Sequence, residues 1–361
     1  MSEGKKFRVL DTGVMEGRLN IAIGQAIIEA HQAGQAPDTL RFLRFPPTAL
    51  VGRHQALGQE IDLEYCRQND IGVVRRITGG GAIFMEPGLL GWELAFNRKT
   101  LGVNSLPDLT REICEAAADG ISRLGVEARY RPRNDIEVDG RKISGTGGFF
   151  DGDVLIYQGT VLVDMNSQQM VSALNIPESK LAKRELDSAA QRVVTLKELL
   201  GDELPGIEAI KAALVKGFTE GLGIAAEPGE ITENEEALAN RHFIEEIGTD
   251  EFVAEIDNPG DDNETLAGSH TGPGGTIDTF VKLEGPTRRI LQRALITGDF
   301  FVTPPRIVFD LEAHLAGTRL DEIDAEIDRF FADNDIDMLS VAPDDFKSAI
   351  YNAVGEESGN G

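Results

Sequence analysis

The most informative stretch of this chain reads Arg75-Arg76-Ile77-Thr78-Gly79-Gly80-Gly81-Ala82-Ile83-Phe84. Three glycines after a predicted strand at 71–75 let backbone N–H groups approach a ligand, because no Cβ stands in the way. Successive exposed amides form a concavity that binds anions. Arg75 and Arg76 add positive charge, but on an alternating strand only one of them can face the ligand. By itself the pattern fits an anion or nucleotide site and a flexible turn equally well.

Two common nucleotide motifs are excluded for this glycine-rich stretch, which we define as residues 75–84. A P-loop needs Lys-Ser/Thr directly after its glycines, and none follows here. A dinucleotide-binding fingerprint needs spaced glycines that open a helix, whereas these glycines are contiguous. A nucleotide site at this position would therefore be of another kind.

A second cluster of polar residues and glycines runs from Arg133 to Gly148. Asp139-Gly140 is a strong signal for a hairpin turn, which would return Lys142 on a strand antiparallel to 135–138. A lysine among glycines can reach a bound phosphate or carboxylate. A single lysine is usually a solvated surface charge, and Asn134-Asp135 could be only a cap or a turn. The combination with the glycine-rich stretch is what favours a functional site.

The mixture of consecutive strands with helices at intervals predicts the α+β class. We expect a domain over 1–256, a linker over 257–273 rich in Gly, Pro, Asp and Asn, and a small α+β domain over 274–361. A glycine-rich turn is predicted between the strands at 135–138 and 154–163. The other predicted strands are 40–45, 71–75, 89–96 and 276–283, and the predicted helices are 19–33, 109–124, 171–174, 196–200, 207–222, 287–294 and 319–332.

The charge of the chain is strongly acidic and unevenly distributed. The formal net charge is −26, with about −5 on residues 1–227 and about −21 on residues 228–361. So acidic a protein would repel nucleic-acid phosphate, and no nucleic-acid partner is expected. The acidic second part could aid solvation in a salty cytoplasm or steer a partner, although a solvated surface without a role is the favoured interpretation.

Neither a membrane segment nor a signal peptide is predicted. No apolar run approaches the roughly 20 residues that span a bilayer, and Met1–Lys6 leads into no apolar segment. We therefore expect a cytoplasmic protein with no membrane partner. Its two cysteines, Cys66 and Cys114, lack metal-type spacing and are interpreted as buried, inert thiols.

Taken together, these motifs resemble those of the lipoate-protein ligases, within the biotin/lipoate ligase superfamily. Residues 75–84 are similar to that family's Arg-Arg-x-Ser/Thr-Gly-Gly-Gly-Ala-Val-Phe signature. Arg133-Asn134-Asp135 and Gly140-Arg141-Lys142-Ile143-Ser144-Gly145 are similar to its Asn-Asp and Gly-Arg-Lys-Ile/Val-Ser-Gly signature. Pro273-Gly274-Gly275 and residues 296–301 resemble the accessory, or lid, domain of these ligases. The resemblance covers nearly the whole chain and implies a biotin/lipoyl protein ligase-like catalytic domain with mixed sheets.

The resemblance implies an enzyme that joins lipoic acid to ATP as lipoyl-AMP, with Mg²⁺, and transfers the lipoyl group to a lysine of an acceptor carrier protein. A lipoyl domain or a glycine-cleavage carrier would be such an acceptor. Lys142 would be catalytic and would contact both substrates, and Asp135 would help to hold Mg²⁺. Gly80 and Trp92 would bind lipoate with Lys142, and Ile83 and Leu90 are further candidates for its apolar slot. For Trp92, ordinary core packing is the favoured interpretation. The residues implied in ATP binding are Arg76, Gly79, Gly80, Gly81, Ala82, Ile83, Phe84 and Lys142.

The acceptor is predicted to dock near the basic run Arg129-Tyr130-Arg131-Pro132-Arg133. The sequence departs from the family pattern at two positions, and both departures affect the contacts expected at the rim of the acyl pocket. Met85-Glu86 replaces the usual His-Asp, and Tyr157-Gln158-Gly159 replaces His-His-Gly.

Two alternatives to the ligase stay open. An octanoyl or lipoyl transferase of the same superfamily would need a nucleophilic cysteine shortly before the lysine motif, and residues 131–135 contain none. A non-catalytic lipoyl-binding assembly protein could keep the fold, but it would not need Lys142 beside an intact glycine-rich stretch.

Overall fold

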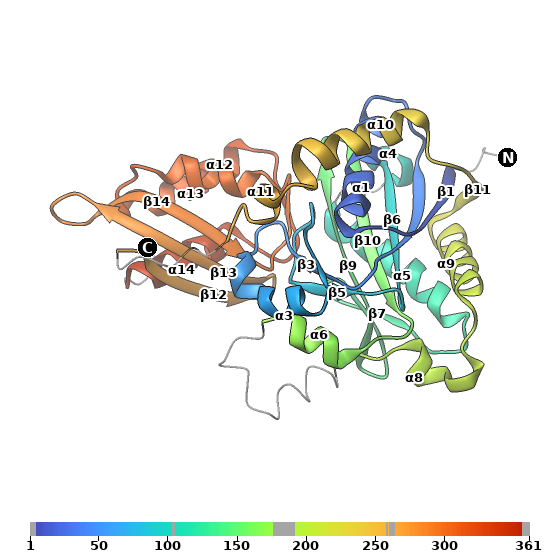
Figure 1. Cartoon of the computed structure of the whole chain (residues 1–361). Helices are drawn as coiled ribbons and strands as arrows, with labels where there is room; N and C mark the ends of the chain where they lie inside the picture. Colours follow the sequence, from blue (N-terminus) through green and yellow to red (C-terminus); the bar gives the residue numbers. More distant parts are fainter. Residues whose placement is uncertain (1–4, 103–104, 176–191, 258, 260–263, 356–361) are drawn as a thin grey trace.

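The structure is a computed structural model that describes residues 5–102, 105–175, 192–257, 259 and 264–355. A large part built on an eight-stranded sheet lies beside a smaller C-terminal part, coloured orange to red in Figure 1. The smaller part has a hydrophobic core of its own, made of residues between 277 and 353. The predicted division at 257–273 stays a prediction.

The eight-stranded sheet is mixed. Its first strands, β11, β1 and β2, pair in parallel, and every later pairing across the sheet is antiparallel. Together with the helices described next, this mixture confirms the predicted α+β class. In spatial order the strands are β11 (Ile224–Pro228), β1 (Lys5–Val14), β2 (Thr39–Arg44), β6 (Leu89–Asn97), β10 (Val154–Leu162), β9 (Arg141–Asp151), β8 (Asp135–Val138) and β7 (Arg129–Arg131).

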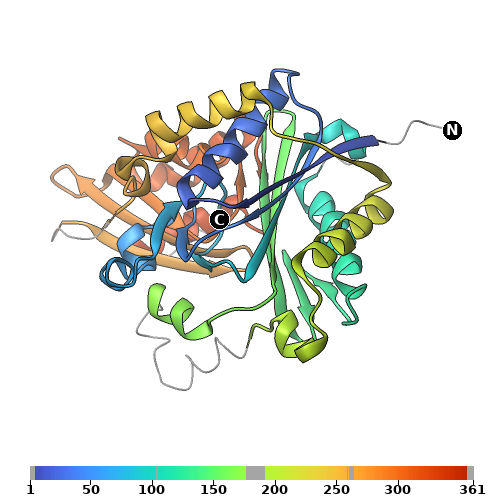
Figure 2. The same cartoon turned by 45° about the vertical axis from the view of Figure 1, so that its right-hand side comes forward.

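Two pairs of helices cover the two faces of this sheet. Helices α1 (Gly17–Gln32) and α10 (Glu233–His242) pack together on one face, and α5 (Leu106–Ser122) and α9 (Ile207–Leu222) pack together on the other (Figure 2). Helices α1, α5 and α9 bury apolar residues at helical spacing, because one side of each faces the sheet. The helices predicted in α1, α5 and α9 are confirmed.

A small three-stranded sheet carries the glycine-rich stretch. Strand β3 (Thr48–Val51) pairs in parallel with β4 (Gly72–Arg75) and antiparallel with β5 (Ile83–Met85). The glycines lie in the connection from β4 to β5, directly after the predicted strand. Short helices next to this sheet are α2 (Leu57–Glu60), α3 (Leu63–Gln68) and α6 (Ser167–Ala173).

The C-terminal part is an antiparallel sheet packed against helices. The strands are β12 (Leu266–Gly272), β13 (Gly275–Glu284) and β14 (Ile290–Gly298), and the helices are α12 (Ile307–Leu315), α13 (Ile323–Asp333) and α14 (Pro343–Val354). Strands β15 (Val302–Thr303) and β16 (Asp337–Met338) form a two-stranded sheet. The remaining elements are α4 (Arg98–Leu101), α8 (Leu196–Leu200), η2 (Gly201–Glu203), η3 (Phe243–Ile247), α11 (Asp250–Val253) and η4 (Leu320–Glu322).

Three local predictions differ from the structure. The helix predicted at 287–294 is wrong, because most of that segment belongs to strand β14. The spacing of its apolar residues fits a helix as well as a strand, and pairing with β13 decides in favour of the strand. The glycine-rich turn predicted before residue 154 is wrong for 141–151, which form strand β9. Residues 266–272 of the predicted linker form β12, and residues 258 and 260–263 lie outside the described residues.

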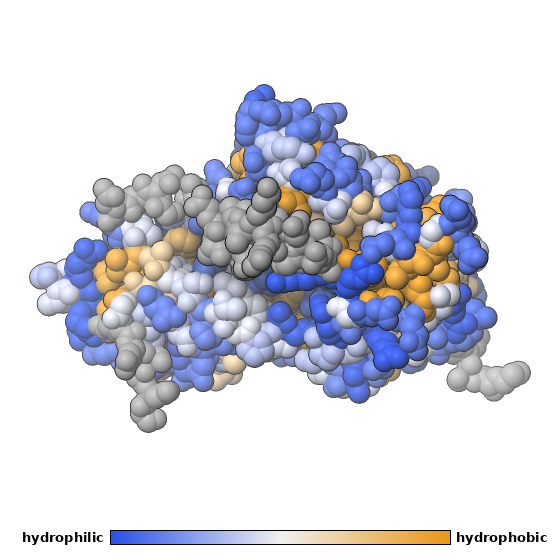
Figure 3. Space-filling view, turned by 90° about the horizontal axis from the view of Figure 1, so that it is seen from below, coloured by the Kyte–Doolittle hydropathy of each residue, from blue (hydrophilic) through white to orange (hydrophobic). Residues whose placement is uncertain are grey.

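None of the helices in the described ranges combines the length and apolar character needed to cross a bilayer. Seen from below, the surface is largely hydrophilic, and hydrophobic atoms gather in separate areas over the two parts (Figure 3).

Candidate active site

The predicted site residues meet at one cavity of about 460 Å³. Strands β9 and β10, the glycine-rich stretch and the hairpin of β8 and β9 all border it, and the C-terminal part closes one side. The lining of this cavity comes from segments more than 200 residues apart in the sequence, so only the tertiary structure brings them together. All ten predicted residues border the cavity: Arg76, Gly79, Gly80, Gly81, Ala82, Ile83, Phe84, Trp92, Asp135 and Lys142.

The β8–β9 hairpin positions the charged groups of the site. Asp139 and Gly140 both adopt positive φ (51° and 77°), as a tight hairpin turn requires, so the predicted hairpin is confirmed. It places the Lys142 Nζ 2.7 Å from Asp135 Oδ1, while Arg131 donates to Asp135 Oδ2 at 2.5 Å. Burial disfavours the charged form of Asp135, but the two cations outweigh it and hold its pKa below the ordinary value of 3.8.

Gly145 makes room for the catalytic candidate. A Cβ at this position would lie 2.7 Å from both Cε and Nζ of Lys142, closer than any real contact. The Lys142 side chain therefore lies directly over the backbone of the next β9 residues, with its ammonium toward the cavity. This contact gives a physical reason for the glycine after Lys-Ile-Ser.

The two arginines of the glycine-rich stretch hold its backbone. Arg75 is fully buried, and its guanidinium donates to the carbonyls of Gly52 and Gln55 at 3.0 and 2.7 Å and to that of Ile256 at 3.0 Å. Arg76 donates to the carbonyls of Gly79 and Gly81 at 2.8 and 2.7 Å. Burial lowers the pKa of both arginines to about 10. As predicted, only one of the two arginines, Arg76, borders the cavity. Its hydrogen bonds to the glycine carbonyls also fix the backbone of the glycine-rich stretch.

The C-terminal part supplies one wall that the sequence analysis missed. The Gly80 N–H donates to the Phe300 carbonyl at 3.1 Å, and the Phe301 ring lies between Gly80 and Gly147. A Cβ on Gly80 or Gly147 would come within 2.5 or 2.3 Å of that ring. Asp299 also borders the cavity. The sequence analysis assigned residues 296–301 to the accessory domain, but nothing in the sequence predicted that they would contact Gly80 and Gly147.

Trp92 borders the cavity, and its role toward lipoate stays a prediction. Its ring is fully buried on the α9 side of the sheet, where it packs 5.0 Å from the Phe218 ring and 6.2 Å from the Tyr157 ring. It borders the cavity only from within this core, and Leu90 lies in the same core away from the cavity. The physical reason is strand alternation, which turns residues 90 and 92 away from the cavity and Leu89 and Gly91 toward it. The apolar side chains that line the slot are Ile21, Leu43, Phe45, Leu50, Ile83, Met85, Leu89, Leu162, Met165, Met170 and Leu174.

The residues that replace the expected histidines are tied into the sheet. The Tyr157 hydroxyl lies 2.7 Å from Thr146 Oγ1, and Thr146 borders the cavity. Gln158 donates from Nε2 to the buried Glu93 at 2.6 Å, which leaves its amide oxygen toward the glycine-rich stretch. Gln158 on β10, Glu93 on β6 and Arg41 on β2 lie opposite one another on neighbouring strands of the sheet.

Both cysteines are buried, as predicted, and neither is activated. Cys114 Sγ lies 3.3 Å from Thr146 Oγ1 and 3.5 Å from the Tyr157 hydroxyl. Burial raises the pKa of Cys114 to about 11 and also raises that of Cys66 to about 11. Neither thiol borders the cavity. A thiolate nucleophile at neutral pH is therefore absent from this cavity.

The predicted basic run is largely neutralised by neighbouring acids. Arg129 pairs with Glu127 at 3.2 Å, and Arg131 pairs with Asp135. Arg133 is exposed and borders the cavity. Of the run, Arg133 is thus the arginine at the mouth of the site.

No group of three or more His, Cys, Asp or Glu side chains suited to a metal ion occurs in the described ranges. Both carboxylate oxygens of Asp135 already accept from cations. One carboxylate is nevertheless enough for Mg²⁺ when substrate phosphates supply other ligands. Asp135 fits that role only if Lys142 shifts toward the substrates.

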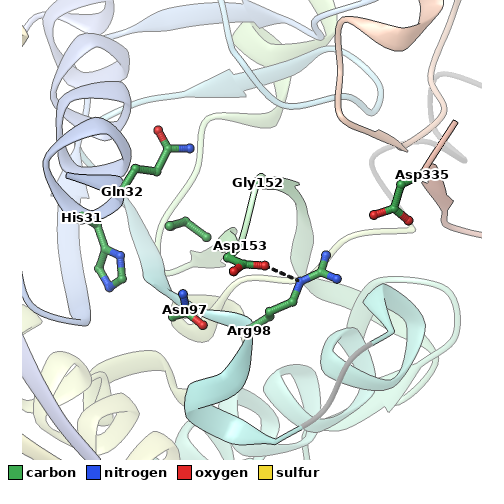
Figure 4. Close-up of a pocket in the computed structure, with 8 residues that line it drawn as sticks. His31, Gln32, Asn97, Arg98, Gly152, Asp153 and Asp335 are labelled. Atoms are coloured by element: carbon green, nitrogen blue, oxygen red, sulfur yellow. Dashed lines mark ion pairs between the residues drawn. The ribbon is translucent and has the colours of Figure 1, made fainter. Parts of the chain in front are cut away.

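A second cavity, of about 540 Å³, lies at the far end of α1 and β6. Arg98 and Asp153 approach each other there, and Asp335 of the C-terminal part lies across from them (Figure 4). None of the predicted site residues borders this second cavity. Its lining carries both positive and negative side chains, which do not converge on one position where a ligand could bind. The 460 Å³ cavity is the stronger candidate.

The sequence model of the lipoyl protein ligase A/B catalytic domain matches residues 16–219, which is more than half of the chain. The chain belongs to this family. The match contains the glycine-rich stretch, the hairpin with Lys142 and both cysteines. Membership makes the protein an enzyme of the lipoate ligase and octanoyltransferase group.

Relatives of both kinds are similar to this lipoyl ligase family member. An octanoyltransferase LipM of Symbiobacterium thermophilum is 31% identical over 272 residues, which cover 68% of this chain and 97% of the relative. Lipoate-protein ligase A subunit 1 of Thermoplasma acidophilum is 28% identical over 245 residues, which cover 65% and 91%.

Solved structures agree on the fold. A bi-partite lipoate protein ligase from Thermoplasma acidophilum, described with its E2 lipoyl domain, has a TM-score of 0.64 and 27% identity over 70% of this chain and 97% of that chain. Lipoate-bound LipL1 of P. falciparum has a TM-score of 0.71 at 17% identity, over 95% of this chain and 99% of that chain. The second likeness shows that the fold extends through the C-terminal part.

Proposed function

We propose that this protein is an ATP-dependent lipoate-protein ligase, which forms lipoyl-AMP and transfers the lipoyl group to a lysine of an acceptor carrier protein. The observation that carries the proposal is a cavity lined by Lys142, by glycine backbone and by apolar side chains, which neither thiol of the chain borders. A ligase needs donors for two anionic substrates, and a transferase needs a thiolate.

In the first step a lipoate carboxylate oxygen attacks the α-phosphorus of ATP, and the bond to pyrophosphate breaks. Lys142 would leave Asp135 and bridge the carboxylate and the α-phosphate, because it is the cation of the β8–β9 hairpin that borders the cavity and its side chain is one-third exposed. In the second step the acceptor lysine nitrogen attacks the acyl carbon, the bond to AMP breaks, and the nitrogen loses a proton. Lys142 would again stabilise the charge that develops on oxygen.

The nucleotide would lie along Gly79, Gly80, Gly81, Ala82, Ile83 and Phe84, with Arg76 behind the loop. Mg²⁺ bound to the phosphates would neutralise part of their charge, and Asp135, which borders the cavity, would help to hold it once Lys142 has moved to the substrates. Since the Gly80 amide donates to Phe300 in this conformation, the turn 298–301 must shift before that amide can reach a phosphate.

The acceptor is proposed to be a lipoyl domain or a similar carrier with acidic residues near its lysine. Arg133 at the mouth of the cavity is the positive group best placed to meet it, whereas Arg129 and Arg131 already have acidic partners. Charge reversal at Arg133 should slow transfer to the acceptor more than formation of the adenylate.

The second candidate is an octanoyltransferase, favoured by the names of several similar relatives. It would need a thioester on cysteine. Both thiols of this chain are buried with pKa values raised to about 11, and Cys114 is held by Thr146 and Tyr157. A reactive thiol would require rearrangement of the core.

Pyrophosphate release with ATP and lipoate tests the proposal directly. The ligase predicts release that depends on lipoate, together with a mass gain on a lipoyl-domain acceptor. The variant Cys114→Ser should keep this activity within about twofold, because Ser conserves the hydrogen bonds. Transfer from an octanoyl carrier without ATP, abolished in Cys114→Ser, would overturn the ligase in favour of the transferase.

A further inference from the structure

Gln158 presents a hydrogen-bond acceptor to the cavity, and a buried carboxylate fixes its direction. The Gln158 Nε2 donates to Glu93 Oε2 at 2.6 Å. An ionised carboxylate only accepts hydrogen bonds, so the NH2 end of the amide faces Glu93 and the oxygen faces away from it. The other Glu93 oxygen lies 3.7 Å from the guanidinium of Arg41. Of these three residues only Gln158 borders the cavity.

The charged pair behind Gln158 is held in place on all sides. Both Arg41 and Glu93 are fully buried, and Arg41 donates to the backbone and side-chain oxygens of Asn20 at 3.0 and 2.7 Å. A Cβ on Gly24 would lie 3.1 Å from Glu93 Oε2, so helix α1 packs directly on the carboxylate. Moving Glu93 would leave a buried guanidinium without its partner, which is costly. Glu93 is thus a positioning residue for the Gln158 amide.

The amide oxygen of Gln158 is open to a ligand. Within the described residues it accepts one hydrogen bond, from the Thr78 hydroxyl at 3.5 Å, which is long for such a bond. A carbonyl oxygen has two lone pairs, so at least one of them is available. Donation from Nε2 to a charged acceptor also polarises the amide and makes its oxygen a stronger acceptor.

This oxygen lies on the same face of the sheet as the Lys142 ammonium. Gln158 is paired with Gly147 on β9, and Gly145, which lies beneath the Lys142 side chain, is two residues away on that strand. Strand geometry separates the backbones of Gln158 and Gly145 by roughly 8 Å. A reacting acyl group can therefore lie between the Lys142 ammonium and the Gln158 oxygen.

Few groups in the proposed reaction can donate to the Gln158 oxygen. The lipoate carboxylate and the phosphates of ATP only accept hydrogen bonds. The amine of the acceptor lysine carries N–H donors and has to reach the acyl carbon. Adenosine also has donors, but the backbone proposed to carry the nucleotide lies in the glycine-rich stretch and not on β10. The acceptor lysine is therefore the ligand that fits this oxygen.

We infer that Gln158 Oε1 accepts an N–H of the acceptor lysine and points the nitrogen lone pair at the acyl carbon of the adenylate. The carbon–nitrogen bond then forms, the bond from the carbon to the AMP oxygen breaks, and the nitrogen releases its proton to water. The inference rests on the proposed function for the identity of the two steps. It gives a role to Gln158, where the family pattern has a histidine.

The two steps can be measured separately. Transfer from supplied lipoyl-AMP to a lipoyl-domain acceptor, followed by mass, reports the second step, and pyrophosphate release in a single turnover without acceptor reports the first. Gln158→Met keeps the length of the side chain but removes the oxygen. It should slow transfer about 10- to 30-fold and leave pyrophosphate release within about twofold. Gln168→Met, at an exposed position of α6, is the control and should change neither rate.

Glu93→Gln tests whether the direction of the Gln158 amide matters. A glutamine at position 93 can donate or accept, so the Gln158 amide can turn its NH2 group toward the cavity. We expect transfer to slow about three- to tenfold while pyrophosphate release stays unchanged. The matched control is Glu235→Gln, which weakens another buried pair, with Arg8, outside the cavity lining. It should lower the thermal midpoint without changing either rate.

Unchanged transfer by Gln158→Met would overturn the inference. Equal losses in both steps would also overturn it, since the oxygen would then serve the nucleotide. A transfer loss in Glu235→Gln as large as that in Glu93→Gln would reduce Glu93 to a structural role. If the unchanged protein released no pyrophosphate, the proposed ligase would fail, whereas selective loss of transfer from supplied lipoyl-AMP in Gln158→Met would still uphold the role of Gln158.

Discussion

The glycine-rich stretch and the β8–β9 hairpin face the same cavity with different kinds of groups. The hairpin presents side chains, since Lys142 points its Nζ at the cavity and Asp135 holds it there. The glycine-rich stretch presents backbone, and its two arginines are engaged by carbonyl oxygens. A positive residue beside a predicted anion site therefore need not be the group that meets the anion.

The difference predicts two classes of variant. Changes in the hairpin should lower the rate of the chemical steps with little effect on folding. Changes in the glycine-rich stretch should alter stability or substrate affinity, because its residues fix the path of the backbone. The following predictions test this contrast, from the largest expected effect to the smallest.

Lys142→Ala should lower kcat for pyrophosphate release about 100- to 1,000-fold, because it removes a donor to charge that develops on oxygen. The thermal midpoint should change little, since the Lys142 side chain is one-third exposed. Lys216→Ala, an exposed lysine of α9, serves as the control. Near-normal adenylation by Lys142→Ala would remove the hairpin from the chemistry.

Arg75→Met should reduce the free energy of unfolding by roughly 3 kcal/mol, because several buried carbonyls lose their donor at once. Denaturant titration measures this change. Arg67→Met, at an exposed arginine of α3, should stay within about 0.5 kcal/mol. A stable Arg75→Met protein with a much slower chemical step would break the contrast, since Arg75 would then act in catalysis.

Asp135→Asn should lower kcat about tenfold, because an amide orients Lys142 more weakly than a carboxylate. The folded-state pKa of Asp135 is depressed, so its pairing stabilises the protein above the unfolded-state value near 3.8 and is lost as pH falls through the lower folded value. The ratio of kcat values for the two proteins should therefore be constant from about pH 5 to about pH 8. A ratio that varies across this range would show that another group controls Lys142.

Phe301→Ala should lower KM for ATP about two- to fivefold, since the ring and the Phe300–Gly80 hydrogen bond occupy the approach to the loop amide. Steady-state kinetics with varied ATP measures the effect. Phe309→Ala is the control. It removes a ring that packs beside Arg53 and His54 at the same junction between the two parts, and Phe309 does not line the cavity. An equal change in both variants, or a higher KM in Phe301→Ala, would contradict this role for Phe301.

Much of the site could be predicted from the sequence, because its motifs are contiguous. The turn at Asp139-Gly140 requires positive φ, and that local requirement sets the position of Lys142 on β9. Trp92 borders the cavity and is also packed in the core beneath α9, as its favoured interpretation expected, and its role toward lipoate stays a prediction. The helix predicted at 287–294 failed because its apolar spacing suits two periods, and only pairing with β13 decides between them.

By itself the sequence determined the α+β class, the family and ten of the residues that border the cavity. It could do so because backbone torsions and short motifs are properties of neighbouring residues. The tertiary structure decided which of the two arginines borders the cavity, which carbonyl oxygens each arginine meets, and that Phe301 lies between Gly80 and Gly147. These facts depend on contacts between distant segments, which form only when the sheets pack against each other.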